Sequence, residues 1–111
     1  MEHLTKETFK QKVFDFEKNK EWNFSGSKPC IIDFYADWCG PCKMLGPVLE
    51  EVSKELGDAV TIAKVNVDQQ EAIASQYNIF SIPTMILFEN GQIARKQVGF
   101  VPKSALIRFI G

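Results

Sequence analysis

The stretch that decides the fold is CIIDFYADWCGPCK, residues 30–43. Its first six residues form a nearly continuous apolar run, which is typical of a strand buried on both faces of a parallel sheet. A helical pattern of apolar residues follows over about residues 41–56, and Gly57 is its natural C′ residue. The turn between strand and helix carries two cysteines, Cys39 and Cys42.

A Cys-x-x-Cys pair at a helix start can cycle between a dithiol and a disulfide. Backbone N–H groups and the positive end of the helix dipole favour a thiolate at Cys39, and a thiolate attacks the disulfides of other proteins. We expect Cys42, one turn further on and more buried, to attack Cys39 in a second step. A structural disulfide and half of a metal site are the alternatives, although Cys30 and His3 offer no matching second pair for the four ligands that zinc usually takes.

The first 29 residues predict one helix and a loop. Thr5 is the expected N-cap, and Phe9, Val13 and Phe16 recur at the spacing of an amphipathic helix of about four turns. Residues 19–29 contain a Ser-Gly-Ser run and are typical of a loop.

Beyond residue 57 the sequence predicts three strands, over residues 60–67, 85–88 and 93–98. The last two are joined by the hairpin signal Asn-Gly at residues 90–91. A short helix is expected from an Asp68 cap to Tyr77, with Glu71 at capping-box spacing. Pro102 suits the first turn of a closing helix.

Strands that alternate with helices indicate an α/β fold with a parallel sheet and right-handed crossovers. We expect the hairpin to add an antiparallel edge, and helices to cover both faces. A chain of 111 residues with 45% hydrophobic content fits a single domain over residues 1–111.

Composition excludes several classes of function. The 13 basic and 14 acidic residues form no basic stripe or polybasic run of the kind that binds nucleic acid or an anionic membrane. The longest apolar runs are far below the roughly 18 residues that span a bilayer. The polar N-terminus lacks an apolar signal-peptide core, and three cysteines do not resemble a secreted disulfide framework, so we expect a cytoplasmic protein.

Asp33 is the most unusual charge in the sequence, because apolar residues surround it in the predicted strand. Burial of a carboxylate is costly and raises its pKa, and a pKa near neutrality suits proton transfer to and from Cys42. Lys64, the lone charge within residues 60–67, is a plausible partner. A buried ion pair kept for structure is the alternative.

The run Trp38-Cys39-Gly40-Pro41-Cys42-Lys43 resembles the active site of the thioredoxin family. The resemblance extends from about residue 30 to the end of the chain, whereas the first 29 residues match only in general pattern. It includes Asp33 six residues before Cys39, Lys64 in the run 63–68, the loop Ser81-Ile82-Pro83-Thr84 that holds the family's cis-proline, and the later groove glycine, Gly99.

This resemblance implies a thioredoxin fold whose central mixed, mostly parallel sheet ends in an antiparallel hairpin. It implies a protein-disulfide reductase and general electron donor, monomeric and without a bound cofactor besides its Cys39–Cys42 disulfide. Protein disulfides would be its substrates, and an NADPH-dependent flavin thioredoxin reductase would re-reduce it. It also implies a cis bond before Pro83 and an apolar substrate-binding patch formed by Trp38, Gly40, Pro41, Ile82, Pro83, Gly99 and Val67.

The sequence departs from the family pattern at several positions. Tyr35 stands where many thioredoxins have a tryptophan, and Phe100 is bulkier than the small residue common beside the groove glycine. The stretch 21–28 looks longer than usual. Cys30 is expected to be a small buried hydrophobe, with a regulatory thiol as the alternative.

Three other functions remain open at this point. A thiol–disulfide isomerase or oxidase would use the same cysteines at a different reduction potential. A non-catalytic binding subunit with the same fold would not need Cys39, Cys42, Asp33, Lys64 and Pro83 together. A metal or iron–sulfur binder would need further ligands.

Overall fold

The computed structural model describes residues 1–12, 28–89 and 92–111. Its strands are β1 (Glu2–His3), β2 (Cys30–Tyr35), β3 (Thr61–Asn66), β4 (Thr84–Glu89) and β5 (Gln92–Val98). Its helices are α1 (Lys6–Lys12), α2 (Gly40–Leu56), the short 3₁₀ helix η1 (Gly57–Ala59), α3 (Glu71–Gln76) and α4 (Lys103–Ile110). The strands form one sheet in the order β1-β3-β2-β4-β5.

The sheet is mixed, as expected, but it is not mostly parallel. β3 pairs in parallel with both β1 and β2, whereas β4 pairs antiparallel with both β2 and β5. The connection between β3 and β4 spans residues 67–83 and includes α3. It returns the chain to the end of the sheet where β3 finishes, because Thr84 at the start of β4 pairs with Phe34, which also pairs with Val65 near the end of β3. β4 therefore runs in the opposite direction to β2 and β3.

β1 is a strand that the sequence did not predict. It has two residues, which pair with Ala63 and Lys64, and the next backbone N–H, that of Leu4, donates to the Lys64 carbonyl at 2.7 Å. Two residues contain no readable periodicity, so this pairing is visible only in the folded chain.

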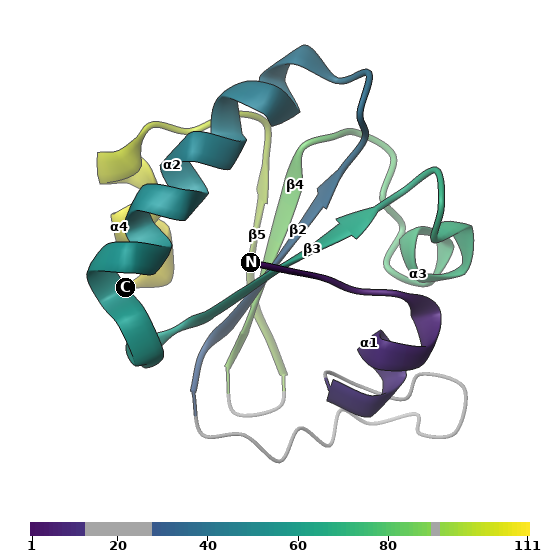
Figure 1. The fold of residues 1–111 in the computed structure, drawn as a ribbon, viewed down its shortest axis with the longest axis horizontal. Coiled ribbons are helices and arrows are strands. Elements are labelled where there is room, and N and C mark those ends of the chain that lie inside the picture. The colour runs from purple at the N-terminus through teal and green to yellow at the C-terminus, as the bar shows by residue number, and fades with distance from the viewer. Residues whose placement is uncertain (13–27, 90–91) are drawn as a thin grey trace.

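Both faces of the sheet are covered by helices, as expected (Figure 1). α1 and α3 lie on one face, where Phe9 and Ile73 pack with Ile32. α2 and α4 lie on the other face, where Leu49 and Leu106 pack with Ile31. Neighbouring residues of β2 thus enter opposite apolar layers, which explains its continuous apolar run.

The N-terminal helix begins where the sequence predicted. The Thr5 hydroxyl accepts a hydrogen bond from the Thr8 backbone N–H at 3.2 Å, which is the bond expected of an N-cap. The predicted continuation through Val13 and Phe16, most of the loop 19–29 and the Asn-Gly turn lie outside the described residues. Within the described residues, none of the helices combines the length and apolar character that a membrane crossing requires.

The predicted Asp68 cap of α3 is wrong. The helix begins at Glu71, and Gln70 at its N-cap position makes no side-chain capping bond. Asn66 at the end of β3 takes the expected role one turn earlier, because its Oδ1 accepts from the N–H groups of Asp68 and Gln69 at 2.9 and 3.2 Å. The Asp68 carboxylate is instead directed to Trp38.

Candidate active site

The two cysteines occupy the first turn of α2, as the sequence predicted. Cys39 is the N-cap residue in an extended conformation, and its Sγ accepts a hydrogen bond from the Cys42 backbone N–H at 3.2 Å. Gly40 begins the helix and Pro41 lies in its first turn. The two sulfurs form a disulfide across Cα atoms 5.2 Å apart. The strand–turn–helix unit therefore places the Cys39 and Cys42 sulfurs close enough to form a disulfide bond.

The expected difference in burial between the two cysteines is not seen. Each is only 4% exposed in the disulfide form. They form a small cluster with Ala36, against which Val67 and Ile82 pack. Cys39 is shielded from solvent by the loop before β4, because its Sγ lies 3.8 Å from the Ile82 carbonyl oxygen in that loop.

The loop before β4 brings further predicted residues to the disulfide. The Ile82–Pro83 peptide bond is cis, as predicted, and Pro83 is buried. The Pro83 carbonyl accepts a hydrogen bond from the Gly99 N–H at 2.8 Å. Gly99 has a φ of 93°, which favours glycine at this position. Ile82, Pro83 and Gly99 are therefore linked side by side at the end of the β4–β5 pair.

Trp38 lies beside the disulfide on the surface, with 71% of its area exposed. Its indole Nε1 donates a hydrogen bond of 2.8 Å to the Asp68 carboxylate. Gly40 and Pro41 are also exposed. Sequence reasoning missed Asp68, because its position next to the predicted helix favoured a capping role instead.

Asp33 is fully buried, and no hydrogen-bond partner for either carboxyl oxygen appears in the described part of the chain. Burial raises the pKa of Asp33 to about 6, and the nearby positive charge of Lys64 only partly opposes this rise. Lys64 is the residue paired with Asp33 across β2 and β3. The two are neighbours, as predicted, yet no ion pair or hydrogen bond joins their side chains among the described residues.

Lys64 is instead stacked on Tyr35. Its Nζ lies 4.2 Å from the centre of the Tyr35 ring, and the Tyr35 hydroxyl forms a 2.8 Å hydrogen bond with His3 Nδ1. Sequence reasoning missed both contacts. The available signal was the strand period, since Asp33 and Tyr35 are two residues apart in β2 and so share one face of the sheet.

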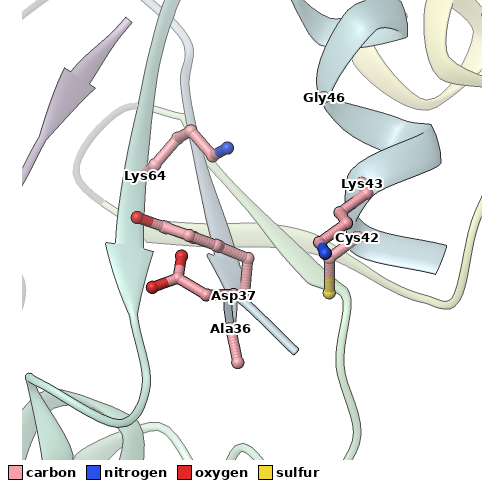
Figure 2. A pocket seen from close by; sticks show the side chains of 7 residues that line it. Ala36, Asp37, Cys42, Lys43, Gly46 and Lys64 are labelled. Atoms are coloured by element: carbon pink, nitrogen blue, oxygen red, sulfur yellow. The ribbon is translucent and has the colours of Figure 1, made fainter. Parts of the chain in front are cut away.

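A pocket of about 440 Å³ lies between the end of β2 and the first turns of α2 (Figure 2). Cys42 and Lys43 face it from α2, and Lys64 faces it from β3. The remaining lining residues are Tyr35, Ala36, Asp37 and Gly46. The pocket thus connects the surroundings of the second cysteine to those of the lysine.

The third cysteine, Cys30, is buried and unbonded at the start of β2. Burial raises the pKa of its thiol to about 12, which keeps it in the unreactive thiol form near neutrality. Among the residues that the structure describes, no three His, Cys, Asp or Glu side chains gather closely enough to hold a metal ion.

Comparison with known proteins places these features in a family. The thioredoxin family model matches residues 1–111. The chain is 42% identical to the thioredoxin of Borreliella burgdorferi over 107 residues, which cover 96% of this chain and 92% of that protein. It is 43% identical to thioredoxin 1 of Synechococcus elongatus over 103 residues, covering 93% and 87%.

A third relative carries a second activity in its name. The chain is 49% identical over 84 residues to the bifunctional thioredoxin reductase/thioredoxin of Mycobacterium leprae, covering 76% of this chain and 18% of that protein. The chain therefore belongs to the thioredoxin family, and it is a thiol–disulfide oxidoreductase that reduces protein disulfides with the Cys39–Cys42 pair.

Proposed function

We propose that Cys39 is the attacking sulfur and Cys42 the resolving sulfur of this reaction. The observation that carries this assignment is the N-cap position of Cys39, where backbone N–H groups and the helix dipole stabilise a thiolate. The Cys39 thiolate attacks one substrate sulfur, and the other substrate sulfur leaves as a thiolate that takes up a proton. Cys42 then attacks Cys39, the mixed disulfide breaks, and the second substrate thiol is released.

Asp33 is proposed to accept the Cys42 proton in the second step, directly or through water. Its support is a buried carboxyl group whose pKa, raised by burial to about 6, lies near neutrality and so suits a general base. Lys64 supplies the positive charge that limits this rise in pKa.

The substrate segment is proposed to lie across the surface around the disulfide. Exposed Trp38, Gly40 and Pro41 border Cys39 on one side, and the loop with Ile82 and Pro83 borders it on the other. An extended segment can pair with the exposed backbone beside Cys39 and ignore most side-chain differences between substrates. Gly99, whose backbone N–H donates a hydrogen bond to the Pro83 carbonyl, completes this surface.

We propose that residues 1–111 work as a single monomeric domain in the cytoplasm. The proposed electron donor is a flavin-dependent thioredoxin reductase that uses NADPH. The support for a reductase partner is the Mycobacterium leprae relative, whose name joins a thioredoxin reductase to a thioredoxin. No bound cofactor is proposed besides the Cys39–Cys42 disulfide.

The test is the reduction of insulin by dithiothreitol, followed as turbidity. The wild-type protein should accelerate it, Cys39→Ser should abolish the acceleration, and Cys30→Ser should retain it as a matched control. A reduction potential of about −270 mV separates a reductase from an isomerase at about −180 mV or an oxidase at about −120 mV. Unchanged turbidity kinetics with the wild-type protein would overturn the proposal.

A further inference from the structure

Four polar side chains share one face of the sheet beneath α2. His3 on β1, Lys64 on β3 and Asp33 on β2 lie in register across three parallel strands. Residues in register on parallel strands present their side chains to the same face, and so do residues two apart on one strand. Tyr35 follows Asp33 by two positions and therefore joins this row.

Tyr35 is held at two points within the row. Its ring supports the Lys64 ammonium at 4.2 Å from the ring centre, well inside the distance of about 6 Å at which a cation and an aromatic face attract. Its hydroxyl is hydrogen-bonded to His3 Nδ1 at 2.8 Å, and the two rings meet edge to face at 5.7 Å. The ring therefore has a defined place over the lysine.

The pKa of the Asp33 carboxyl group depends on the position of the Lys64 ammonium group. Since the ammonium group is placed over the ring, it makes no ion pair with the Asp33 carboxylate in the described structure. Burial consequently dominates the Asp33 pKa, which is about 6. A direct ion pair with a lysine lowers a carboxyl pKa by about 1–3 and weakens the carboxylate as a base.

We propose that Tyr35 is a positioning residue that holds the Lys64 ammonium over its ring and so prevents it from pairing with Asp33. The functional value of this arrangement rests on the proposed role of Asp33 as the base for Cys42. The hydrogen bond between the Tyr35 hydroxyl and His3 Nδ1 anchors the ring. The choice of Tyr35 at the end of β2 thus sets the strength of the buried base.

Other charged and titratable side chains lie near these four residues, and the variants below leave them unchanged. They are Asp37 in the loop after β2, and Cys42 and Lys43 on α2, which line the pocket beside Lys64 and Tyr35. Asp37 also acts on Tyr35 electrostatically. Use of the oxidised protein removes the titration of Cys42, because a disulfide sulfur carries no proton.

The experiment is an NMR titration of the Asp33 carboxyl carbon in the oxidised protein. Tyr35→Leu removes the ring, so Lys64 moves to Asp33 and the Asp33 pKa falls by about 1. Tyr35→Phe keeps the ring but removes the hydroxyl that binds His3, so the Asp33 pKa should fall by less than in Tyr35→Leu. Tyr35→Met is the second ring-deleting variant, with a longer side chain to fill the space should Tyr35→Leu fail to fold.

A double-mutant cycle distinguishes a fall in the Asp33 pKa caused by Lys64 from one caused by water that enters the space left by the ring. Lys64→Met should raise the Asp33 pKa, and adding Tyr35→Leu to Lys64→Met should then change it little. An equal fall in both backgrounds would show that hydration acts without Lys64 and would overturn the inference. No fall in Tyr35→Leu alone would overturn it as well.

The pH profile of disulfide reduction distinguishes failure of this inference from failure of the proposed function. If Asp33 is the base, the acid limb of the second step moves to lower pH in Tyr35→Leu by the same amount as the Asp33 pKa. A shifted pKa with an unmoved acid limb supports the positioning role of Tyr35 and contradicts the catalytic role of Asp33.

Discussion

At the scale of single residues, Asp33 is the group whose proposed role as a base conflicts with the stability of the fold. It is a fully buried carboxyl group in the middle of β2, without a hydrogen-bond partner in the described part of the chain. Burial raises its pKa from 3.8 to about 6, so the folded protein holds this proton more tightly than the unfolded chain does. The folded state is therefore destabilised as pH rises from about 4 to about 6.

Replacing this group should stabilise the protein in a pH-dependent way. Since one pKa unit corresponds to about 1.4 kcal/mol, we expect Asp33→Asn to raise the free energy of unfolding by about 3 kcal/mol at pH 7. The gain should be small at pH 4, near the unfolded-state pKa of 3.8, and should vanish at lower pH, where Asp33 is protonated in both states. Urea unfolding of the oxidised protein at the two pH values measures it.

The control for this variant is Asp37→Asn, which neutralises an exposed carboxylate four residues later. It should leave the free energy of unfolding nearly unchanged at both pH values. A stability gain of Asp33→Asn that is equal at pH 4 and pH 7 would show that ionisation of Asp33 is not its cause.

The candidate site residues that lie close together in the sequence could be predicted from it. Cys39, Cys42 and Asp33 were found from the sequence because each stands out within one short stretch, 30–43. The bond from Trp38 to Asp68 and the stack of Lys64 on Tyr35 were not found. Both join side chains from different strands and loops, so their partners are set by sheet register rather than by sequence spacing.

At the scale of elements, side chains from neighbouring strands help to determine where some helices begin and how they end. The start of α2 was predictable because Cys39 caps it from within the local turn. The start of α3 was not, because Asn66 takes the capping position at the end of β3 by binding the N–H groups of Asp68 and Gln69, and α3 begins only at Glu71. The end of α4 depends on Arg95 of β5, whose Nη1 donates to the Phe109 and Arg108 carbonyls at 2.7 and 3.3 Å.

The Arg95 contact should stabilise the last turn of α4. The carbonyls at a helix C-terminus lack intrahelical partners, and a basic side chain that binds them also complements the helix dipole. We expect Arg95→Ala to lower the free energy of unfolding by about 1 kcal/mol, measured by urea unfolding at neutral pH.

Lys96→Ala is the matched control for this contact, because Lys96 is the next exposed basic residue on β5 and points to the other face of the sheet. Its removal should change the free energy of unfolding by less than about 0.5 kcal/mol. Equal losses in the two variants would contradict a capping role for Arg95.

At the scale of the whole molecule, the sequence predicted the layers better than the strand directions. The apolar residues of β2 and the one-sided pattern of α2 were enough to predict a sheet with helices on both faces. The antiparallel placement of β4 beside β2 was missed, since the direction of β4 depends on where residues 67–83 return the chain to the sheet, which no local pattern shows. β1 was missed because a two-residue strand forms only by pairing with β3.

The whole arrangement supports the transfer of two electrons from the Cys39–Cys42 dithiol to a substrate disulfide, which leaves the pair as a disulfide. The sheet presents the end of β2 and the loop before β4 to the start of α2 (Figure 1). There the Cys39–Cys42 disulfide lies against the Ile82 carbonyl. If Cys39 attacks and Cys42 resolves, removing the resolving sulfur must leave the substrate covalently bound.

The most direct test is therefore a trapping measurement by intact-mass spectrometry under non-reducing conditions. Reduced Cys42→Ser, mixed with insulin, should form a stable mixed disulfide located at Cys39. Reduced Cys39→Ser should form little or none in the same time. An adduct that forms mainly through Cys42, or the absence of any adduct with Cys42→Ser, would contradict the assigned roles of the two sulfurs.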